Sequence, residues 1–213
     1  MLWIIPAILV SYLVGSIPTA YIFCRLLKGI DIRTVGSGNV GATNALRVLG
    51  KGWGVVILLL DILKGLVPVV IVGDLIATKV LFLSNEQLRV LIGICCISGH
   101  NWTVFLNFKG GKGIATTLGV LLGFALRIPG LSIILGLLII TWFSVFMLSR
   151  IVSLASIIAA VCLPVYALVF RQSSFIIFSG IILALFAVIR HKANIKRLFA
   201  RQEPRLNFKK QPK

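Results

Sequence analysis

The chain has 213 residues, of which 59% are hydrophobic and only 13% are charged. Soluble domains carry about 25% charged residues, so this composition excludes an ordinary soluble globular protein. Lys and Arg outnumber Asp and Glu by 22 to 5, which gives a formal net charge of +17. Nine of those 22 basic residues lie in residues 190–213, directly after an apolar run, which indicates the cytoplasmic side of a membrane. We therefore expect membrane lipids, and not nucleic acid, as a partner.

Apolar runs separated by helix breakers predict a polytopic membrane protein. A helix needs about 20 apolar residues to cross a hydrocarbon core of about 30 Å. The runs predict seven helices, over residues 2–26, 52–73, 86–106, 113–127, 130–148, 151–170 and 174–190. The segment 113–127 is short for a span, so a five-pass arrangement in which two segments dip into the membrane stays open. The predicted class is an all-α integral membrane protein, with residues 1–213 forming one domain.

The distribution of basic residues predicts the orientation of these spans. If the N-terminus lies outside, 17 of the 22 Lys and Arg residues fall on the inner side, four fall outside and Lys64 lies within a span. This split agrees with the positive-inside rule. We expect the N-terminal run to be a first span and not a signal peptide, and residues 191–213 to form a basic cytoplasmic tail.

The connection over residues 36–47 has the composition of an anion-binding loop. Its backbone-freeing and hydrogen-bonding residues are Gly36, Ser37, Gly38, Asn39, Gly41, Thr43 and Asn44. Glycines let successive N–H groups surround an anion, and Arg47 adds a guanidinium that can bind phosphate through two hydrogen bonds. A flexible loop capped by Thr43 or Asn44 is the alternative. The stretch also matches G-x-G-x-x-G, but no strand precedes it, so a dinucleotide site is excluded.

A second glycine-rich turn surrounds Lys112, at the predicted start of the helix 113–127. Gly110, Gly111 and Gly113 flank this lysine. The N–H groups of a helix start, together with an ammonium, form a phosphate site. The alternative is an ordinary inward-facing lysine on a hinge.

His100 precedes this turn and is a candidate to bind a substrate oxygen or to act as a base. A structural histidine is an equally good interpretation. The glycerolipid acyltransferase signature H-x-x-x-x-D is absent, because Phe105 stands where the Asp is required. A His–Asp pair of that kind is therefore excluded.

Further polar residues lie in two later segments predicted to face the same side. Ser149, Ser153 and Ser156 share one helical face, where packing between helices is the favoured role. His191 and Asn194 share another face and would add donors at the membrane surface, or form a solvated basic face. All four polar stretches fall on the predicted inner side, which predicts a single site at the cytoplasmic face. Within the membrane, Asp61 and Lys64 are expected to neutralise each other.

These residues together resemble one family, the bacterial acyl-phosphate:glycerol-3-phosphate acyltransferases, or PlsY family. The first motif of the family, G-S-G-N-x-G-A-T-N-x-x-R, is matched in full by residues 36–47. Its second motif resembles residues 100–113, with Thr103 where the family commonly has Pro. The serine-rich stretch 149–156 and the segment 190–203 are also similar to it.

The resemblance implies an enzyme of the bacterial cytoplasmic (inner) membrane whose active site faces the cytoplasm. It would move a fatty acyl group from acyl phosphate to the sn-1 hydroxyl of glycerol 3-phosphate, giving lysophosphatidic acid and inorganic phosphate. This is the first acylation of phospholipid biosynthesis, and it uses no metal or other cofactor. We expect a monomer; contact with other phospholipid-synthesis enzymes stays open.

Roles follow for the candidate residues. Those expected to take part in catalysis are Ser37, Arg47, His100 and Lys112. Those expected to bind substrate or phosphate are Gly36, Gly38, Asn39, Gly41, Thr43, Asn44, Gly110, Gly111, Ser153, Ser156, His191 and Asn194.

Two other classes of function remain as alternatives. Glycine-broken helices are also typical of transporters, here of an anionic solute, although polar motifs on one side argue against a path across the membrane. A scaffold protein would leave the anion loops unexplained. The cysteines lie in apolar segments without a C-x-x-C pair, which favours buried thiols over a metal site or a disulfide. They are Cys24, Cys95, Cys96 and Cys162.

Overall fold

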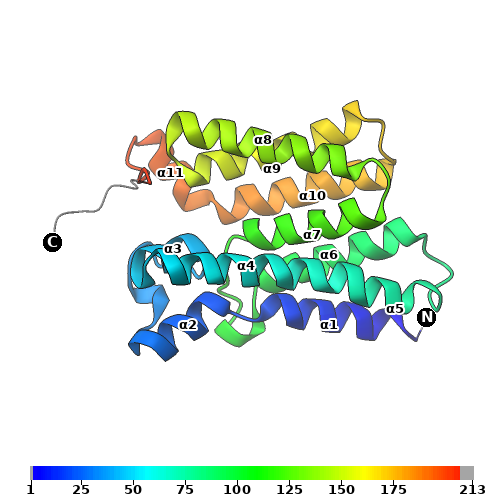
Figure 1. Cartoon of the computed structure of the whole chain (residues 1–213), viewed down its shortest axis with the longest axis horizontal. Coiled ribbons are helices and arrows are strands. Elements are labelled where there is room, and N and C mark those ends of the chain that lie inside the picture. The colour runs from blue at the N-terminus through cyan, green and yellow to red at the C-terminus, as the bar shows by residue number, and fades with distance from the viewer. Residues whose placement is uncertain (1, 207–213) are drawn as a thin grey trace. The chain divides into compact units, whose positions relative to one another are not determined.

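The structure is a computed structural model that describes residues 2–206, and every regular element in them is a helix (Figure 1). The all-α class predicted from the sequence is confirmed. The chain divides into two compact units, residues 1–132 and 133–213, and each is described by itself. The predicted basic tail differs in one respect, because residues 192–199 form a helix. Its residues 207–213, which include Lys209, Lys210 and Lys213, lie outside the described part of the chain.

The elements follow the predicted segments closely. In the first unit they are α1 (Ile4–Ser16), α2 (Thr19–Lys28), η1 (Ile32–Thr34), α3 (Ala42–Leu49), α4 (Lys51–Val67), η2 (Pro68–Val72), α5 (Gly73–Ala77), α6 (Asn85–Asn101), η3 (Val104–Leu106) and α7 (Ile114–Arg127). The helices α8 (Leu131–Ser149), α9 (Val152–Val169), α10 (Ser174–Arg190) and α11 (Lys192–Phe199) follow.

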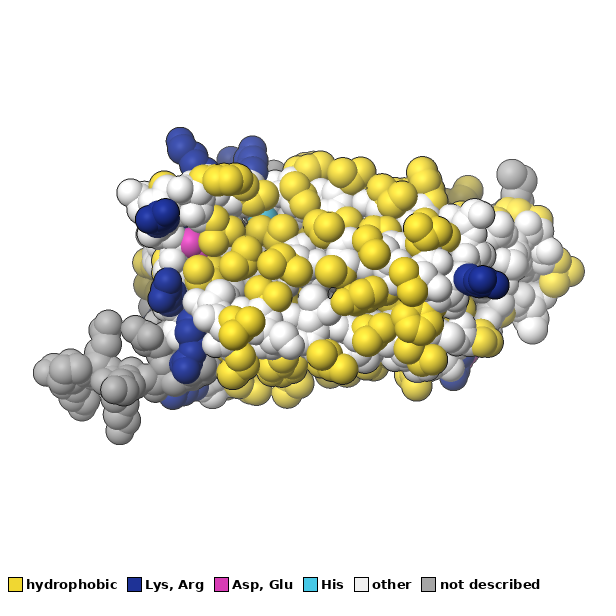
Figure 2. All heavy atoms as spheres, turned by 90° about the horizontal axis from the view of Figure 1, so that it is seen from above, with side chains coloured by type: hydrophobic (Ala, Val, Ile, Leu, Met, Phe, Trp, Pro, Cys, Tyr) yellow, Lys and Arg dark blue, Asp and Glu magenta, His cyan; other side chains and the backbone are white. Residues whose placement is uncertain are grey.

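Length and hydropathy identify the segments that can cross a membrane. Among the described residues, five meet both criteria: Ile4–Lys28, Lys51–Ala77, Asn85–Leu106, Leu131–Ser149 and Val152–Val169. The pair α10 and α11 is bent by 64° and counts as a sixth if it forms one span, whereas α7 is shorter. Large apolar side chains are exposed along these helices, for example Leu59 and Ile71 on the second segment, and apolar atoms dominate the face in Figure 2. An apolar exterior suits contact with lipid.

The first predicted helix, over residues 2–26, is in fact two helices, because Pro18 has no N–H with which to continue the ladder of α1. The break leaves main-chain carbonyls that need other donors, since an unpaired carbonyl is costly in a membrane. The hydroxyl of Thr103 donates to the carbonyl of Ser16 at 2.6 Å. The ammonium of Lys64 donates to the carbonyl of Ile17 at 2.8 Å. Two residues distant in sequence, Lys64 and Thr103, therefore supply hydrogen-bond donors to the break between α1 and α2.

Glycines bring the helices of the first unit into close contact. A Cβ on Gly15 of α1 would collide with the backbone of Cys96 on α6, and a Cβ on Gly119 of α7 would collide with the backbone of Ile62 on α4. The pairs α1–α6 and α4–α7 lie side by side (Figure 1). Small residues at such crossings are the usual means of packing helices in membranes.

Directly after the C-terminal end of α4, an arginine supplies a hydrogen-bond donor to a second irregular helical turn. The π-helical turn η2 disrupts the regular ladder, and Arg89 of α6 donates to the carbonyl of Val69 at 2.6 Å. The same guanidinium pairs with Asp74, which also pairs with Arg127 at 2.6 Å. Arg127 is the last residue of α7, at the end opposite Gly113.

In the second unit, hydrogen bonds and close packing join consecutive helices. The hydroxyls of Thr141 on α8 and Tyr166 on α9 lie 2.7 Å apart. Trp142 of α8 donates to Ser156 of α9 at 3.1 Å. Gly180 of α10 lies against Pro164 of α9.

Candidate functional site

The first glycine-rich motif is a loop wrapped around the side chain of Asn44. The amide oxygen of Asn44 accepts from the N–H of Ser37 at 2.9 Å. Its NH₂ group donates to the carbonyls of Val35 at 3.0 Å and Ile32 at 3.3 Å. Asn44 is buried, so it shapes the loop from beneath. The predicted contact of the Asn44 amide with phosphate stays a prediction.

The other residues of the first motif lie in the loop around the Asn44 side chain and in α3. Gly36 and Gly38 have φ values of 60° and 69°, a region that suits glycine, so the backbone turns tightly here as the sequence predicts. Ser37 is exposed, and Asn39 and Thr43 are half-buried. Gly41 is the N-cap of α3. Arg47 is exposed in the last turn of the same helix.

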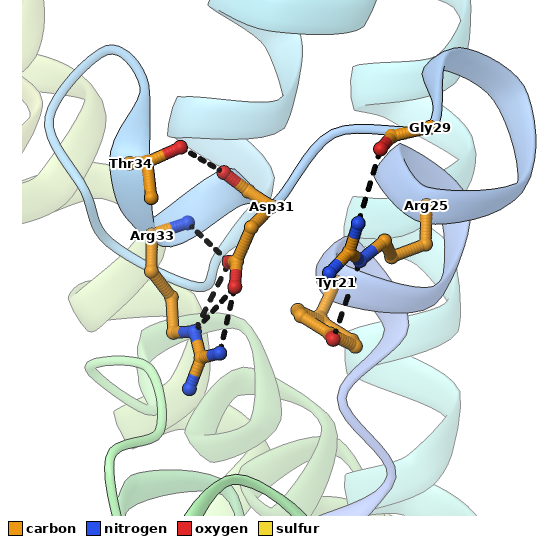
Figure 3. Close-up of polar contacts among 6 residues, drawn as sticks. All are labelled: Tyr21, Arg25, Gly29, Asp31, Arg33 and Thr34. Atoms are coloured by element: carbon orange, nitrogen blue, oxygen red, sulfur yellow. Dashed lines mark hydrogen bonds and ion pairs between the residues drawn. The ribbon is translucent and has the colours of Figure 1, made fainter.

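The segment that enters this loop is shaped by an ion pair at its surface. Asp31 accepts the N–H of Arg33 at 2.9 Å and pairs with its guanidinium at 2.6 Å (Figure 3). These hydrogen bonds lower the pKa of the Asp31 carboxyl to about 2. The Arg33 and Arg25 guanidinium carbons lie 5.4 and 5.8 Å from the centre of the Tyr21 ring, so two cations lie close to one aromatic ring.

The second motif is a tight turn held by the end of α6. The N–H of Gly111 donates to the carbonyl of His100 at 3.0 Å, and the N–H of Gly110 donates to that of Asn101 at 3.3 Å. Gly113, with a φ of 76°, is the N-cap of α7. The half-buried Lys112 therefore stands directly before a helix start, as predicted.

The two motifs meet at Gly111. A Cβ on this residue would collide with the ring of His100 on one side and would lie 2.8 Å from the carbonyl oxygen of Val40 on the other. Val40 belongs to the first motif, so the loop 36–47 and the turn 110–113 lie against each other. A small cavity opens at this junction. Its lining residues are Ser16, Ile17, Pro18, Thr19, Val40, Lys64, His100, Thr103, Gly110 and Gly111.

Buried polar groups lie behind the cavity. The ion pair between Asp61 and Lys64 that the sequence predicts is confirmed, with Nζ and Oδ1 2.8 Å apart. The hydroxyl of Thr19 donates to the same carboxylate oxygen at 2.6 Å. His100 is buried, and its Nδ1 lies 3.1 Å from the hydroxyl of Thr116 and 3.9 Å from Asp61. Thr19 was not singled out from the sequence, because only the break before it brings it to Asp61.

Like Thr19, Asn101 is a residue near the site that the sequence motifs do not predict. Its side chain is 0% exposed, and neither of its polar atoms has a hydrogen-bond partner among residues 2–206. Its amide oxygen lies beneath Gly113, where a Cβ would collide with it. Together with the Gly110 contact, this places Asn101 directly under the Lys112 turn.

In the second unit, the later polar residues gather around Glu203. The carboxylate accepts from the hydroxyl of Ser153 at 2.7 Å and from the amide of Asn194 at 2.6 Å. Arg197 completes the group at 2.7 Å. Burial raises the pKa of the Glu203 carboxyl, but the hydrogen bonds from these three residues outweigh burial and leave the pKa below its ordinary value. One carboxylate thus ties α9, α11 and the segment after α11 together.

Two other predicted residues of this unit are engaged in helix contacts. Ser156 donates to the carbonyl of Val152 at 2.8 Å and accepts from Trp142, which agrees with the packing role favoured from the sequence. His191 is buried at the junction of α10 and α11, with Nδ1 2.7 Å from the carbonyl of Ala187. Ser153 and Asn194 donate to Glu203, and their predicted contact with substrate stays a prediction.

Comparison with known proteins identifies the relatives of this chain. A family model described as glycerol-3-phosphate acyltransferase matches residues 5–201. Proteins of that name from Desulforudis audaxviator and a Synechococcus species are 45% and 44% identical, over 94% and 93% of both chains. A crystal structure of PlsY (YgiH), an integral membrane glycerol 3-phosphate acyltransferase, in its glycerol 3-phosphate form matches with a TM-score of 0.83 and 36% identity over 96% of each chain. The lysophosphatidic acid form of that enzyme matches with a TM-score of 0.80 and 35% identity, over 96% of this chain and 95% of that one.

Proposed function

This chain belongs to the glycerol-3-phosphate acyltransferase family, and we propose that it transfers a fatty acyl group from acyl phosphate to the sn-1 hydroxyl of glycerol 3-phosphate. The products are lysophosphatidic acid and inorganic phosphate. It acts in the bacterial inner membrane, with the N-terminus outside and the site facing the cytoplasm. The 17-to-4 excess of basic residues on the predicted inner side supports this orientation.

The observation that carries the proposal is the meeting of two glycine-rich elements at Val40 and Gly111. The reaction has two phosphate-bearing substrates, and each glycine-rich element can surround an anion with N–H groups. Each element also has a cation. Arg47 on α3 belongs to the first element, and Lys112 before α7 belongs to the second. Two anion-binding elements in contact suit a reaction that must bring two phosphates together.

The chemistry needs little beyond this arrangement. The glycerol hydroxyl oxygen attacks the acyl carbonyl carbon, the bond from that carbon to the phosphate oxygen breaks, and the hydroxyl proton passes to the departing phosphate. Acyl phosphate is already an activated anhydride, so positioning and stabilisation of the leaving phosphate supply the catalysis. In this scheme Lys112 and Arg47 stabilise phosphate charge, and the loop N–H groups orient it.

Other residues then take supporting roles. His100 holds the Gly110–Gly111 turn through its carbonyl and its ring, and it is not required as a base. Asn44 shapes the first loop. Glu203, with Ser153 and Asn194, fixes the segment after α11 in the second unit.

The test is turnover by protein purified in detergent. We expect phosphate release from palmitoyl phosphate to require glycerol 3-phosphate and to match the lysophosphatidic acid formed, with the acyl chain at the sn-1 position. Palmitoyl-CoA serves as a parallel donor and should be inert. Product from the thioester but not from the acyl phosphate would overturn the donor assignment.

The transporter alternative has its own readout. Absence of turnover with either donor, in a preparation that unfolds cooperatively on heating, would overturn the enzyme assignment. Uptake of glycerol 3-phosphate into sealed proteoliposomes would then support a carrier. Under the present proposal we expect turnover and no uptake.

A further inference from the structure

An intramembrane ion pair lies outside every glycine-rich motif, yet it borders the cavity where they meet. Asp61 and Lys64 belong to α4, within the candidate span Lys51–Ala77, and are only 1% and 7% exposed. Charged groups at membrane depth are expensive, so their presence calls for a role. Mutual neutralisation alone would explain little, because two apolar residues would serve α4 at lower cost.

The side chains of Asp61 and Lys64 form hydrogen bonds with residues outside α4. Lys64 donates to the carbonyl of Ile17 at 2.8 Å, and Asp61 accepts from Thr19 at 2.6 Å. These two residues lie on either side of Pro18, where α1 ends and α2 begins. The pair therefore clamps both sides of the break in the first membrane segment.

The same carboxylate faces the second motif. Asp61 Oδ1 lies 3.9 Å from Nδ1 of His100, and Thr116 of α7 lies against that nitrogen at 3.1 Å. On its other side the His100 ring leaves no room for a Cβ at Gly111, and the His100 carbonyl accepts the Gly111 N–H. A short chain of contacts thus runs from the ion pair through His100 to the turn that carries Lys112.

We propose that Asp61 and Lys64 are positioning residues for acyl transfer, which fix the turn 110–113 and its ammonium by clamping the α1–α2 break and His100. The inference rests on the proposed acyltransferase function. Neither residue touches substrate in this scheme. Their effect is geometric, since a displacement of about 1 Å at a reacting group costs about 100-fold in rate.

The main test replaces both charges together, in Asp61→Leu/Lys64→Met, so that neither charge is left unpaired. Such replacements often keep or increase stability. We expect cooperative thermal unfolding near the wild-type temperature, a fall of about 100-fold in kcat and a smaller change in both KM values. A kcat within twofold of wild type would overturn the inference.

Two further variants keep the inference testable if the double variant does not fold. Thr19→Val retains both charges and removes only the hydroxyl that holds α2 to Asp61; we expect kcat to fall about tenfold, a net loss typical of one hydrogen bond. Lys64→Arg retains the ion pair and the donor to Ile17, and should restore most of the activity lost in the double variant. Wild-type activity in Thr19→Val, or a Lys64→Arg variant as impaired as the double variant, would contradict a positioning role.

The matched control is Asp74→Asn on α5, which breaks the ion pairs with Arg89 and Arg127. It should lower the unfolding temperature and leave kcat within twofold. A wild-type protein without acyltransferase turnover would refute the proposed function itself. Normal wild-type turnover with an unimpaired double variant would refute only the role of the ion pair.

Discussion

The two units of the chain differ in the group that accepts or donates the hydrogen bonds of their polar segments. In residues 1–132, uncharged groups shape both glycine-rich elements: the Asn44 amide holds the first, and main-chain carbonyls of His100 and Asn101 hold the second. In residues 133–213, a single carboxylate on Glu203 gathers Ser153, Asn194 and Arg197. The groups that bind the two glycine-rich elements directly, the Asn44 amide and the two carbonyls, do not ionise. The Glu203 carboxylate does, so acid should weaken the contacts of the second unit.

The largest effect is expected at Lys112, the cation that stands between Gly111 and Gly113 before α7. Lys112→Met should reduce kcat by about 100- to 1,000-fold, the usual cost of removing one group that stabilises developing charge. Lys109→Met, an exposed lysine of the same turn, is the control and should remain near wild type.

The next variant removes the Asn44 amide, which holds the loop 36–47. Asn44→Leu removes three hydrogen bonds to the loop 36–47, and we expect kcat/KM to fall about 100-fold as the loop N–H groups lose their orientation. Asn44→Asp keeps an acceptor for Ser37 but loses the donors to Ile32 and Val35, so its activity should be intermediate. Equal activity in all three proteins would show that the loop shapes itself.

The corresponding variant in the second unit is Glu203→Gln, whose effect should appear in stability. Hydrogen bonds to a charged group contribute about 1.5–3 kcal/mol, so the free energy of unfolding should fall by about that amount. Arg205→Gln removes an exposed charge two residues away and is the control. A Glu203→Gln protein as stable as wild type would remove the distinction between the units.

Acid should reproduce this loss in the wild-type protein. The folded pKa of Glu203 lies below its ordinary value of 4.5, so its contribution to stability is complete above that pH. The contribution is lost as the pH falls from 4.5 through the lower folded pKa. Unfolding temperatures measured from pH 7 downward should fall more steeply for wild type than for Glu203→Gln, and parallel curves would contradict this.

The smallest effect is expected at the surface of the first unit. Asp31 pairs with Arg33 near solvent, where such pairs contribute about 0–1 kcal/mol. Asp31→Asn should therefore leave turnover within twofold at neutral pH. A larger loss would mean that the entry to the loop 36–47 depends on charge after all.

The sequence predicts the helices well, because hydropathy and the length of a span constrain them strongly. The predicted segment 86–106 coincides with Asn85–Leu106, and 130–148 with α8. The break at Pro18 was missed because the apolar run continues through it. The sequence does not predict the helix α11, because this helix is short and basic.

The two glycine-rich elements of the candidate site are predicted from the sequence, but the partners of their side chains are not. Glycine spacing predicts both elements without any structure. Whether an amide such as that of Asn44 faces a ligand or the loop backbone depends on the tertiary fold, as does the choice of Glu203 as the acceptor for Ser153. The ion pair of Asp61 and Lys64 follows from their i, i+3 spacing, but its contacts across the break at Pro18 do not.

The break at Pro18 also bears on the order in which the chain can assemble. The carbonyl of Ser16 accepts from Thr103, which is synthesised 87 residues later, and the carbonyl of Ile17, which also accepts from the N–H of Thr19, gains a second donor in Lys64, synthesised 47 residues later. Until the third membrane segment emerges, the carbonyl of Ser16 therefore lacks the donor that it has in the folded protein. We expect the N-terminal helices to reach their final form only once α6 has been inserted, so the earliest part of the chain to be made is among the last to be completed.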